Sequence, residues 1–379
     1  MANKKIMEEN LNLGVKSKLR ISRSCSLTVV LGLLFTVFCF LVAYDNNFPK
    51  NATFAGQLIF LAAKGEGVEE ISRHLEEQGI IRCAFSFRLY AFLTGRAGKL
   101  QAGRYYLSPA MANAEILEKL ASGETAKETI TVIEGWGISD IGRILEEKGI
   151  LQNDFFQIVG FPIGRARMLS GIVDPADCSA GLNFLRAKDL NPEFSFLQDK
   201  PPELNLEGYL FPDTYEIDAE IKTETLVRKM LANFDKKLSP ELREEIKKQD
   251  KTIFQIVVMA SMLEKEMRGA ADKKLVSGIL WKRLEAGMPL QVDATVLYGA
   301  SKTSGPVSAS DLDFCSPYNT YKFIGLPYGP ISNPGLESII AAIEPQPSAY
   351  WYYLSAPDGT TFFSETLTEH NIKKIKYLK

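Results

Sequence analysis

The sequence predicts an α+β protein that is held in a membrane by a single N-terminal helix. Three observations indicate this class: residues 25–44 form a long uncharged run, two segments 70 residues apart repeat each other, and the C-terminal half alternates helix-like segments with loops rich in glycine and proline. The 379 residues are 46% hydrophobic and 24% charged, which is enough for one or two folded cores. The formal charge is −2 and no domain is strongly basic, so nucleic acid is not expected as a partner.

The apolar run CSLTVVLGLLFTVFCFLVAY (25–44) has the length and composition of a transmembrane helix. Its residues would cover about 30 Å, the hydrocarbon thickness of a bilayer. Six basic side chains precede it, against two glutamates. The positive-inside rule therefore predicts that residues 1–24 are a cytoplasmic basic tail and that residues 45–379 lie outside the cell (inner) membrane. A cleaved signal peptide is the alternative, although a cut after Ala43 would place Leu41 poorly at the −3 position.

An internal repeat organises the first part of the exported chain. KGEGVEEISRHLEEQGI (64–80) and EGWGISDIGRILEEKGI (134–150) are identical at nine of seventeen positions. Each copy follows a strand-like run and predicts an amphipathic helix, for which Gly79 and Gly149 are expected to be C-terminal caps. A second strand at 102–107 and a helix at 113–123 follow the first copy. We therefore predict a strand–helix–helix–strand module over 45–125, and a second repeat with a connecting segment over 126–205.

The remaining residues, 206–379, are predicted to form a mainly helical domain. The segment LEGYLFPDTYEI (206–217) is compact and aromatic, and Pro212 restricts it to a strand edge or a turn. From 288 to 335 the chain is dense in glycine, proline, serine and asparagine, which predicts loops. The expected helices lie at roughly 222–235, 239–249, 252–268, 271–286 and 335–343, and the strand YWYYLSA (350–356) leads to a short terminal helix.

Several kinds of chemistry are excluded by the motifs that the sequence lacks. It has two histidines, His74 and His370, and none of the HExxH, G-x-S-x-G or GxxxxGK[ST] patterns. The five cysteines (Cys25, Cys39, Cys83, Cys178 and Cys315) show no metal-ligand spacing. Three of them lie beyond the apolar run and allow at most one disulfide, although isolated buried thiols are the simpler interpretation. No metal site and no cofactor is therefore expected.

The best remaining catalytic group is the carboxyl group of Glu264. In a helix over 252–268, Ile253, Val257, Ala260 and Glu264 share one stripe, so the acid takes a position where a core residue is expected. Burial there would raise its pKa, as a general acid requires. The alternative is a structural ion pair with Arg268.

Glu266 lies about 200° around the same helix and cannot face Glu264. A hydrolase would need a second carboxylate across the sugar. Glu207, Asp213 and Asp293 could each supply it, and the sequence does not choose among them.

Taken together, these segments resemble the MltG/YceG-like endolytic murein transglycosylase family. The motifs that carry the resemblance occur in the family's order from about residue 57 to the C-terminus: EGWGISDIGRIL (134–145), LEGYLFPDTYEI (206–217), ASMLEKEM (259–266), LQVDATVLYG (290–299), SPYNTY (316–321), GLPYGPISNPG (325–335) and FFSETLTEHN (362–371).

The resemblance implies a membrane-anchored enzyme with a LysM-like module and a YceG-like catalytic domain. It implies cleavage of the MurNAc–GlcNAc β-1,4 bond within nascent peptidoglycan strands, which would leave 1,6-anhydro-MurNAc ends and terminate glycan elongation. Peptidoglycan synthases are implied as partners. The family's catalytic residue corresponds to Glu264, which would act alone because the C6 hydroxyl of the sugar attacks the anomeric carbon. The residues that would bind glycan are Gln291, Asp293, Tyr318, Asn319, Tyr321, Asn333 and Glu207.

The sequence departs from the family pattern at a few motif positions. Ala294 and Tyr328 each replace a usual proline, Lys282 stands where an asparagine is common, and Gly359-Thr360-Thr361 replaces Gly-Gly-His. One alternative is a non-catalytic, membrane-anchored glycan-binding scaffold for cell-wall synthases. A second is a pyridoxal-dependent aminodeoxychorismate lyase, because the family has carried that label, but a transmembrane anchor argues against a cytosolic type of enzyme.

Overall fold

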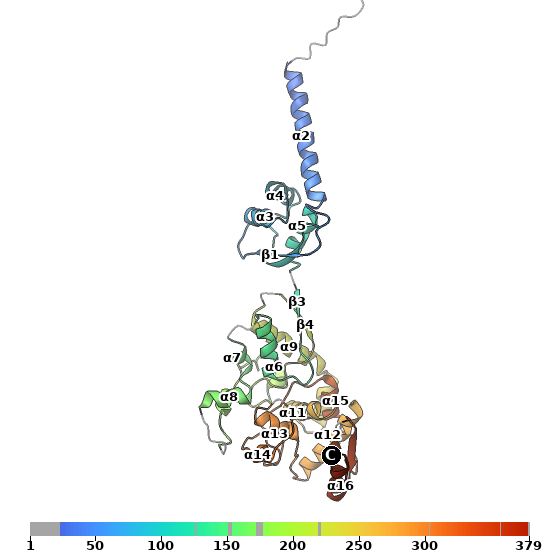
Figure 1. Ribbon diagram of the computed structural model, residues 1–379. Coiled ribbons are helices and arrows are strands. Elements are labelled where there is room, and N and C mark those ends of the chain that lie inside the picture. The colour runs from blue at the N-terminus through green and yellow to red at the C-terminus, as the bar shows by residue number, and fades with distance from the viewer. Residues whose placement is uncertain are drawn as a thin grey trace, which may run out of the picture. The chain divides into compact units, whose positions relative to one another are not determined.

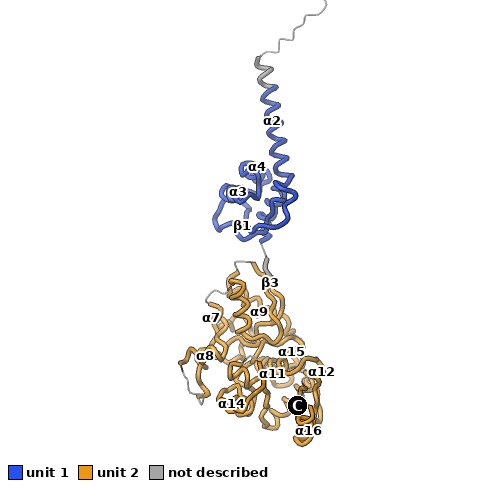
Figure 2. The backbone as a smooth tube through the Cα atoms, in the orientation of Figure 1, with its two compact units in different colours: residues 1–126 blue, residues 127–379 orange. Residues whose placement is uncertain are grey.

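The computed structural model describes residues 23–125, 127–150, 154–171, 177–218, 221–302, 304–356 and 358–377. The chain forms two compact units, Met1–Ala126 (unit 1) and Lys127–Lys379 (unit 2), shown in different colours in Figure 2. Of the predicted basic tail, residues 1–22 lie outside the described residues.

The predicted apolar helix is present as α2 (Arg23–Asn47). Within it, Val29–Asn47 is the one helix of the described chain that is long and apolar enough to cross a membrane. Only 6% of its apolar window is buried inside the protein. A core helix would be mostly buried, so this exposure is compatible with a membrane anchor or a signal sequence.

Unit 1 has the predicted strand–helix–helix–strand order. It comprises β1 (Leu58–Ala62), α3 (Val68–Glu77), α4 (Ala84–Leu93) and β2 (Gly103–Leu107), followed by α5 (Asn113–Ser122). The two strands pair antiparallel, with Phe60 opposite Tyr105. Both of these rings are buried with Ile71, Leu75 and Leu117 in one small core, so alternate strand positions supply the sheet's contribution to it.

The second repeat has the same strand–helix–helix–strand order, but more residues separate its second helix from its second strand. It comprises β3 (Lys127–Thr131), α6 (Ile138–Glu147), α7 (Phe155–Val159) and β4 (Thr214–Asp218). An insertion between α7 and β4 contains α8 (Ile163–Ser170) and two 3-10 turns (Leu182–Phe184 and Ser195–Leu197). β3 and β4 pair antiparallel, with Ile130 opposite Tyr215. The expected boundary between residues 205 and 206 therefore falls inside unit 2. Gly79 and Gly149 have φ of 73° and 68°, which confirms both predicted caps.

The rest of unit 2 is built around one buried helix. Figure 1 labels most of its elements: α9 (Thr223–Lys237), α10 (Pro240–Lys248), α11 (Ile253–Glu266), α12 (Ala270–Glu285), α13 (Asp293–Gly299), α14 (Ala309–Asp313), α15 (Leu336–Ile343), the antiparallel hairpin of β5 (Tyr352–Ser355) and β6 (Thr361–Ser364), and α16 (Leu367–Tyr377). α11 is buried from Ile256 to Leu263 and packs against α15 and α12. The longer predicted helices are confirmed. The short helices α13 and α14 lie where only loops were expected.

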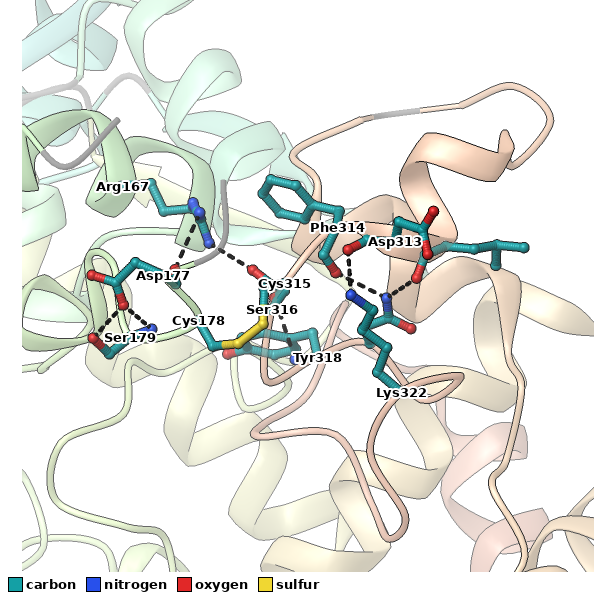
Figure 3. The surroundings of a disulfide bond; sticks show 12 residues. Arg167, Asp177, Cys178, Ser179, Asp313, Phe314, Cys315, Ser316, Tyr318 and Lys322 are labelled. Atoms are coloured by element: carbon teal, nitrogen blue, oxygen red, sulfur yellow. Dashed lines mark hydrogen bonds between the residues drawn. A yellow bond between two sulfur atoms is a disulfide. The ribbon is translucent and has the colours of Figure 1, made fainter. Parts of the chain in front are cut away.

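A disulfide bond joins Cys178 to Cys315 (Figure 3). Their Cα atoms are 4.7 Å apart, within the range of such bonds. Arg167 strengthens the same junction, because its Nη1 donates to the carbonyl of Cys315 at 3.2 Å and its Nη2 to that of Asp177 at 3.5 Å. The interpretation of these two residues as isolated thiols was therefore wrong. The structural reason is that a sequence separation of 137 residues conceals their proximity in the fold.

Candidate active site

Glu264 lies in the last turn of α11, where the buried stripe of that helix reaches the surface. The helix begins with a capping box in which Thr252 accepts from the backbone of Gln255 and Gln255 accepts from the backbone of Thr252. It ends where Met267 turns to an extended conformation. The side chain of Glu264 is 9% exposed, so its carboxyl group is close to solvent but largely covered.

The carboxylate of Glu264 is held by three donors from two other helices. The Ser338 hydroxyl and the Gly335 N–H donate to Oε2 at 2.6 and 3.0 Å, and Lys273 Nζ of α12 lies 3.3 Å away. Gly335 is the N-cap of α15, so the carboxylate also meets the positive end of that helix. These surroundings are polar, whereas the sequence predicted apolar ones. The ion-pair partner is Lys273 and not Arg268, the partner in the alternative interpretation.

A second carboxylate, that of Glu134, lies beside the first. It belongs to the turn between β3 and α6, and a Cβ atom placed on Gly335 would come within 2.0 Å of its Oε1. Partial burial raises the pKa of Glu134, and the negative charge of Glu264 raises it further while Lys273 opposes the shift. Asn333 fixes the turn, because its carbonyl accepts from the Gly135 N–H at 2.9 Å and its N–H donates to the Trp136 carbonyl at 2.8 Å.

Glu134 is not among the residues expected from the sequence, although the repeat carries a signal for it. At the equivalent position of the first copy the chain has Lys64, so a cation is exchanged for a carboxylate at the start of an otherwise similar turn. The three residues considered earlier for a second carboxylate are engaged elsewhere. Glu207 is buried, Asp213 accepts from Asn233 at 2.9 Å, and Asp293 accepts from Tyr321 at 2.5 Å.

Four of the predicted glycan-binding residues lie in the interior: Glu207, Tyr318, Asn319 and Asn333. The carboxyl group of Glu207 accepts from the Ile138 N–H at 3.0 Å, from the Tyr298 hydroxyl at 3.1 Å and from Asn333 Nδ2 at 3.3 Å. Asn319 Nδ2 donates to the carbonyls of Leu312 and Phe314 at 2.9 and 3.0 Å. Buried side chains with these partners position loops and have no surface to offer a sugar.

The raised pKa of the buried Glu207 predicts that the stability of the protein depends on pH. Burial raises its pKa from 4.5 to about 8. Between these pH values the folded state keeps a proton that the unfolded chain has lost, so this contribution is complete below about pH 4.5 and disappears as the pH rises through about 8. We expect Glu207→Gln, which cannot ionise, to flatten the fall in the free energy of unfolding by at most about 1.4 kcal/mol per pH unit. Urea unfolding between pH 5 and about 8.5 measures it, and parallel wild-type and variant curves would contradict it.

Of the other three predicted residues, Gln291 and Asp293 are exposed and Tyr321 is half-buried. Gln291 has a φ of +55°, an uncommon left-handed conformation for this residue type. The Tyr321 hydroxyl donates to Asp293 Oδ1 at 2.5 Å. Beside them, Tyr353 donates to Glu266 Oε2 at 3.4 Å, and burial together with the charge of Asp293 raises the pKa of Glu266 to about 7. The end of α11 thus carries two carboxylate clusters, one at Glu264 with Glu134 and one at Glu266 with Asp293.

The buried ion pair of Lys273 with Glu264 predicts a specific loss of stability. Lys273 is 4% exposed, so Lys273→Met would leave a largely buried carboxylate without its cation and should lower the free energy of unfolding by about 3 kcal/mol. Adding Glu264→Gln should restore most of this loss, because no unpaired charge remains. Lys274→Met is the control, since Lys274 forms an exposed pair with Glu344 and should change stability by at most about 0.5 kcal/mol. Equal urea midpoints for the two single variants would contradict the prediction.

Within the described residues, no group of three or more histidine, cysteine, aspartate or glutamate side chains could hold a metal ion. The site is therefore an arrangement of carboxylates, one buried lysine and a helix N-terminus.

Comparison with known proteins identifies the family. The profile of the YceG-like family matches residues 60–376. The chain belongs to the YceG-like family. This YceG-like chain is 32% identical over 316 residues to an endolytic murein transglycosylase of Bacillus subtilis (strain 168), covering 83% of each sequence. The resemblance seen in the sequence is thereby confirmed.

Two further relatives support the same assignment. An endolytic murein transglycosylase of Streptococcus pneumoniae serotype 2 is 29% identical over 340 residues, which cover 86% of this chain and 59% of the relative. The crystal structure of a YceG-like protein from Listeria monocytogenes shares 30% sequence identity and has a TM-score of 0.53, covering 84% of this chain and 99% of that chain. The YceG-like fold therefore extends over most of the present chain.

Proposed function

We propose that this YceG-like protein is an endolytic murein transglycosylase, a lyase that cleaves the MurNAc–GlcNAc β-1,4 bond within nascent glycan strands and so terminates their elongation. The observation that carries the proposal is the position of Glu264. It follows the apolar stripe of α11 and presents its carboxyl group at the N-terminus of α15. The motif resemblance implies that it corresponds to the family's catalytic glutamate. The proposal is supported by the 32% sequence identity to a relative of that name, in an alignment that covers 83% of the chain.

In the proposed mechanism the protonated form of Glu264 acts first as an acid, and the resulting carboxylate then acts as a base. Its proton passes to the glycosidic oxygen as the bond to the anomeric carbon breaks, and GlcNAc leaves with a free 4-hydroxyl. The C6 hydroxyl of MurNAc then attacks the anomeric carbon and gives its proton back to Glu264, so a 1,6-anhydro ring forms without water. Ser338, Gly335 and Lys273 orient the carboxylate and stabilise its charge after the first transfer.

Glycan would contact the exposed residues Gln291 and Asp293 and the half-buried Tyr321, whose positions depend on the buried residues beneath them. Thr320 links the two sets, because its carbonyl accepts from the Gln291 N–H at 3.2 Å. Asn319 fixes the same loop, since its Oδ1 accepts from the Tyr321 N–H at 3.0 Å. We assign Glu207, Tyr318, Asn319 and Asn333 to this supporting role.

Mass spectrometry of the products tests the reaction type. Purified full-length protein acting on uncross-linked glycan strands should yield 1,6-anhydro-MurNAc ends, which are lighter than reducing ends by one water. Reducing MurNAc ends would overturn the lyase proposal and indicate a hydrolase. In that case Glu134, which lies beside Glu264, is the candidate for the second carboxylate of a hydrolase.

A non-catalytic glycan-binding scaffold is the second candidate, and one observation favours it. Glu264 is largely covered and fully engaged with donors, which is also how a structural carboxylate is held. The Glu264→Gln experiment described in the Discussion separates this role from catalysis.

For the location of the protein, we propose a single-pass anchor in the cell membrane with the N-terminus in the cytoplasm. The exposed apolar surface of α2 and the basic residues that precede it in the sequence support this orientation. Fusing an enzyme reporter that is active only in the cytoplasm after Lys379 tests this orientation. Activity of the fused reporter would contradict it.

Unit 1 is proposed to be a LysM-like module that binds glycan and recruits peptidoglycan synthases. Its strand–helix–helix–strand order with an antiparallel strand pair supports the proposal. Deleting residues 57–123 while keeping α2 should weaken cleavage of long strands more than it alters the bond that is cut. Unchanged activity on intact sacculi would count against the module.

A further inference from the structure

Helix α4 of unit 1 is apolar on the face that it turns away from the core. Its sequence is AFSFRLYAFL, and Phe87 and Ala91 are buried in the core of the unit. On the outer face, Phe85, Phe92 and Leu93 are 53%, 75% and 71% exposed. A helix on the surface of a soluble domain normally turns polar side chains outward, so large apolar side chains gathered on one helix indicate a contact surface.

This face is continuous with the apolar surface of α2. Figure 1 shows α4 at the end of unit 1 from which α2 extends. The ring of Phe85 lies 6.5 Å from the ring of Phe38 of α2. Below this contact, Asn46 Nδ2 donates to Ser86 Oγ at 3.0 Å, and both side chains are buried. The two helices therefore meet through a polar contact at the base of α2 and an aromatic contact farther along it.

Aromatic side chains mark the expected level of the membrane surface on α2. Tyr44 and Phe48 are exposed and stacked at 4.8 Å, and the guanidinium group of Arg82 lies 5.6 Å from the ring centre of Tyr44. Exposed aromatic rings beside a cation are typical of the interface between hydrocarbon and headgroups. Phe38 lies six residues before Tyr44, about 9 Å farther along the helix and away from the body of unit 1. Phe85, which contacts Phe38, is therefore on the hydrocarbon side of that level.

We propose that the outer face of α4, formed by Phe85, Phe92 and Leu93, inserts into the outer half of the phospholipid bilayer that α2 crosses. This inference rests on the proposed anchor. α2 and α4 would then hold unit 1 at two points, which fixes the orientation of the module on the membrane instead of leaving it free on one helix. A module oriented in this way presents its surfaces to glycan close to the membrane.

Nitroxide labels on the full-length protein test the insertion. All labelled proteins carry Cys25→Ser, Cys39→Ser and Cys83→Ser, so that only the introduced cysteine reacts with the label, and they keep the Cys178–Cys315 disulfide. One label is placed by Phe92→Cys, a matched water-exposed control by Arg73→Cys on α3, and an anchor control by Phe35→Cys on α2. The protein is reconstituted in vesicles of phosphatidylethanolamine and phosphatidylglycerol. Collisions with oxygen, which concentrates in hydrocarbon, are compared with collisions with a water-soluble nickel complex.

The expected result is that positions 92 and 35 collide several-fold more with oxygen than with nickel, and that position 73 shows the reverse. A label at 92 that behaves like the one at 73 while 35 remains in lipid would overturn the insertion and leave the anchor intact. A label at 92 that is shielded from both reagents would mean that protein covers the face, which also overturns the proposal. A water-exposed label at 35 would instead refute the anchor itself.

Discussion

Replacing Glu264 by glutamine is expected to lower the rate of glycan cleavage on the order of 10²–10⁴-fold. Glutamine has nearly the same size, and its amide oxygen can still accept from Ser338, from the Gly335 N–H and from Lys273. The helix end should therefore remain folded. It has no titratable proton to give to the leaving oxygen. The rate of product formation from uncross-linked glycan strands measures the effect, and thermal unfolding of the same sample checks that the variant is folded.

Glu266→Gln is the matched control, two residues later in the same helix. The pKa of Glu266 is about 7, so near neutral pH much of it is already protonated, and glutamine resembles that form. We therefore expect less than about a tenfold change in rate. A reversed order of the two variants would assign the acid to Glu266. Cleavage at the wild-type rate by a folded Glu264→Gln protein would support the scaffold role instead.

Removing the Cys178–Cys315 disulfide is expected to give the largest loss of stability. The bond joins residues 137 positions apart, and in the chain-entropy model closing so long a loop contributes about 5 kcal/mol. The double variant Cys178→Ser, Cys315→Ser should therefore unfold at a much lower urea concentration than the wild type. It should also lower activity, because Cys315 immediately precedes the loop that carries Tyr318 and Tyr321.

Cys83→Ser provides the control for this experiment, since Cys83 is a free thiol and its loss opens no loop. Its urea midpoint should stay close to that of the wild type. If the double variant also kept the wild-type midpoint, the disulfide would not form in the purified protein. Treating the wild type with a reductant should reproduce the effect of the double variant.

Much of the fold could be predicted because its signals are local in the sequence. The apolar length of α2, the 3.6-residue periodicity of α3 and α6, and the glycines after them each depend on neighbouring residues alone. The pairing of β3 with β4 was not predicted, because the partners are separated by the whole insertion and a five-residue strand carries no record of its partner. The helices α13 and α14 have seven and five residues, too few to show a periodicity.

The glycan-binding predictions show the same limit for polar residues in loops. Asn333 and Glu207 occur in segments rich in glycine and proline, where polar side chains are normally solvated. In the structure both are buried, and each accepts a hydrogen bond from a backbone N–H that is distant in the sequence. Asn333 accepts from the Leu210 N–H at 3.0 Å, and Glu207 accepts from the Ile138 N–H at 3.0 Å. Whether a loop residue faces water or pairs with distant backbone depends on contacts that the local sequence does not contain.

The sequence by itself determined the apolar anchor segment, the repeated strand–helix unit and the place of Glu264 at the end of an apolar helical stripe, because chain length, periodicity and capping act between residues a few positions apart. Only the tertiary structure decided what surrounds that carboxylate. Lys273 reaches it from α12, Ser338 from the first turn of α15, and Glu134 from the second repeat. These groups come from three separate parts of the chain. A buried charge is stable only where packing brings donors such as Lys273 and Ser338 within hydrogen-bond distance.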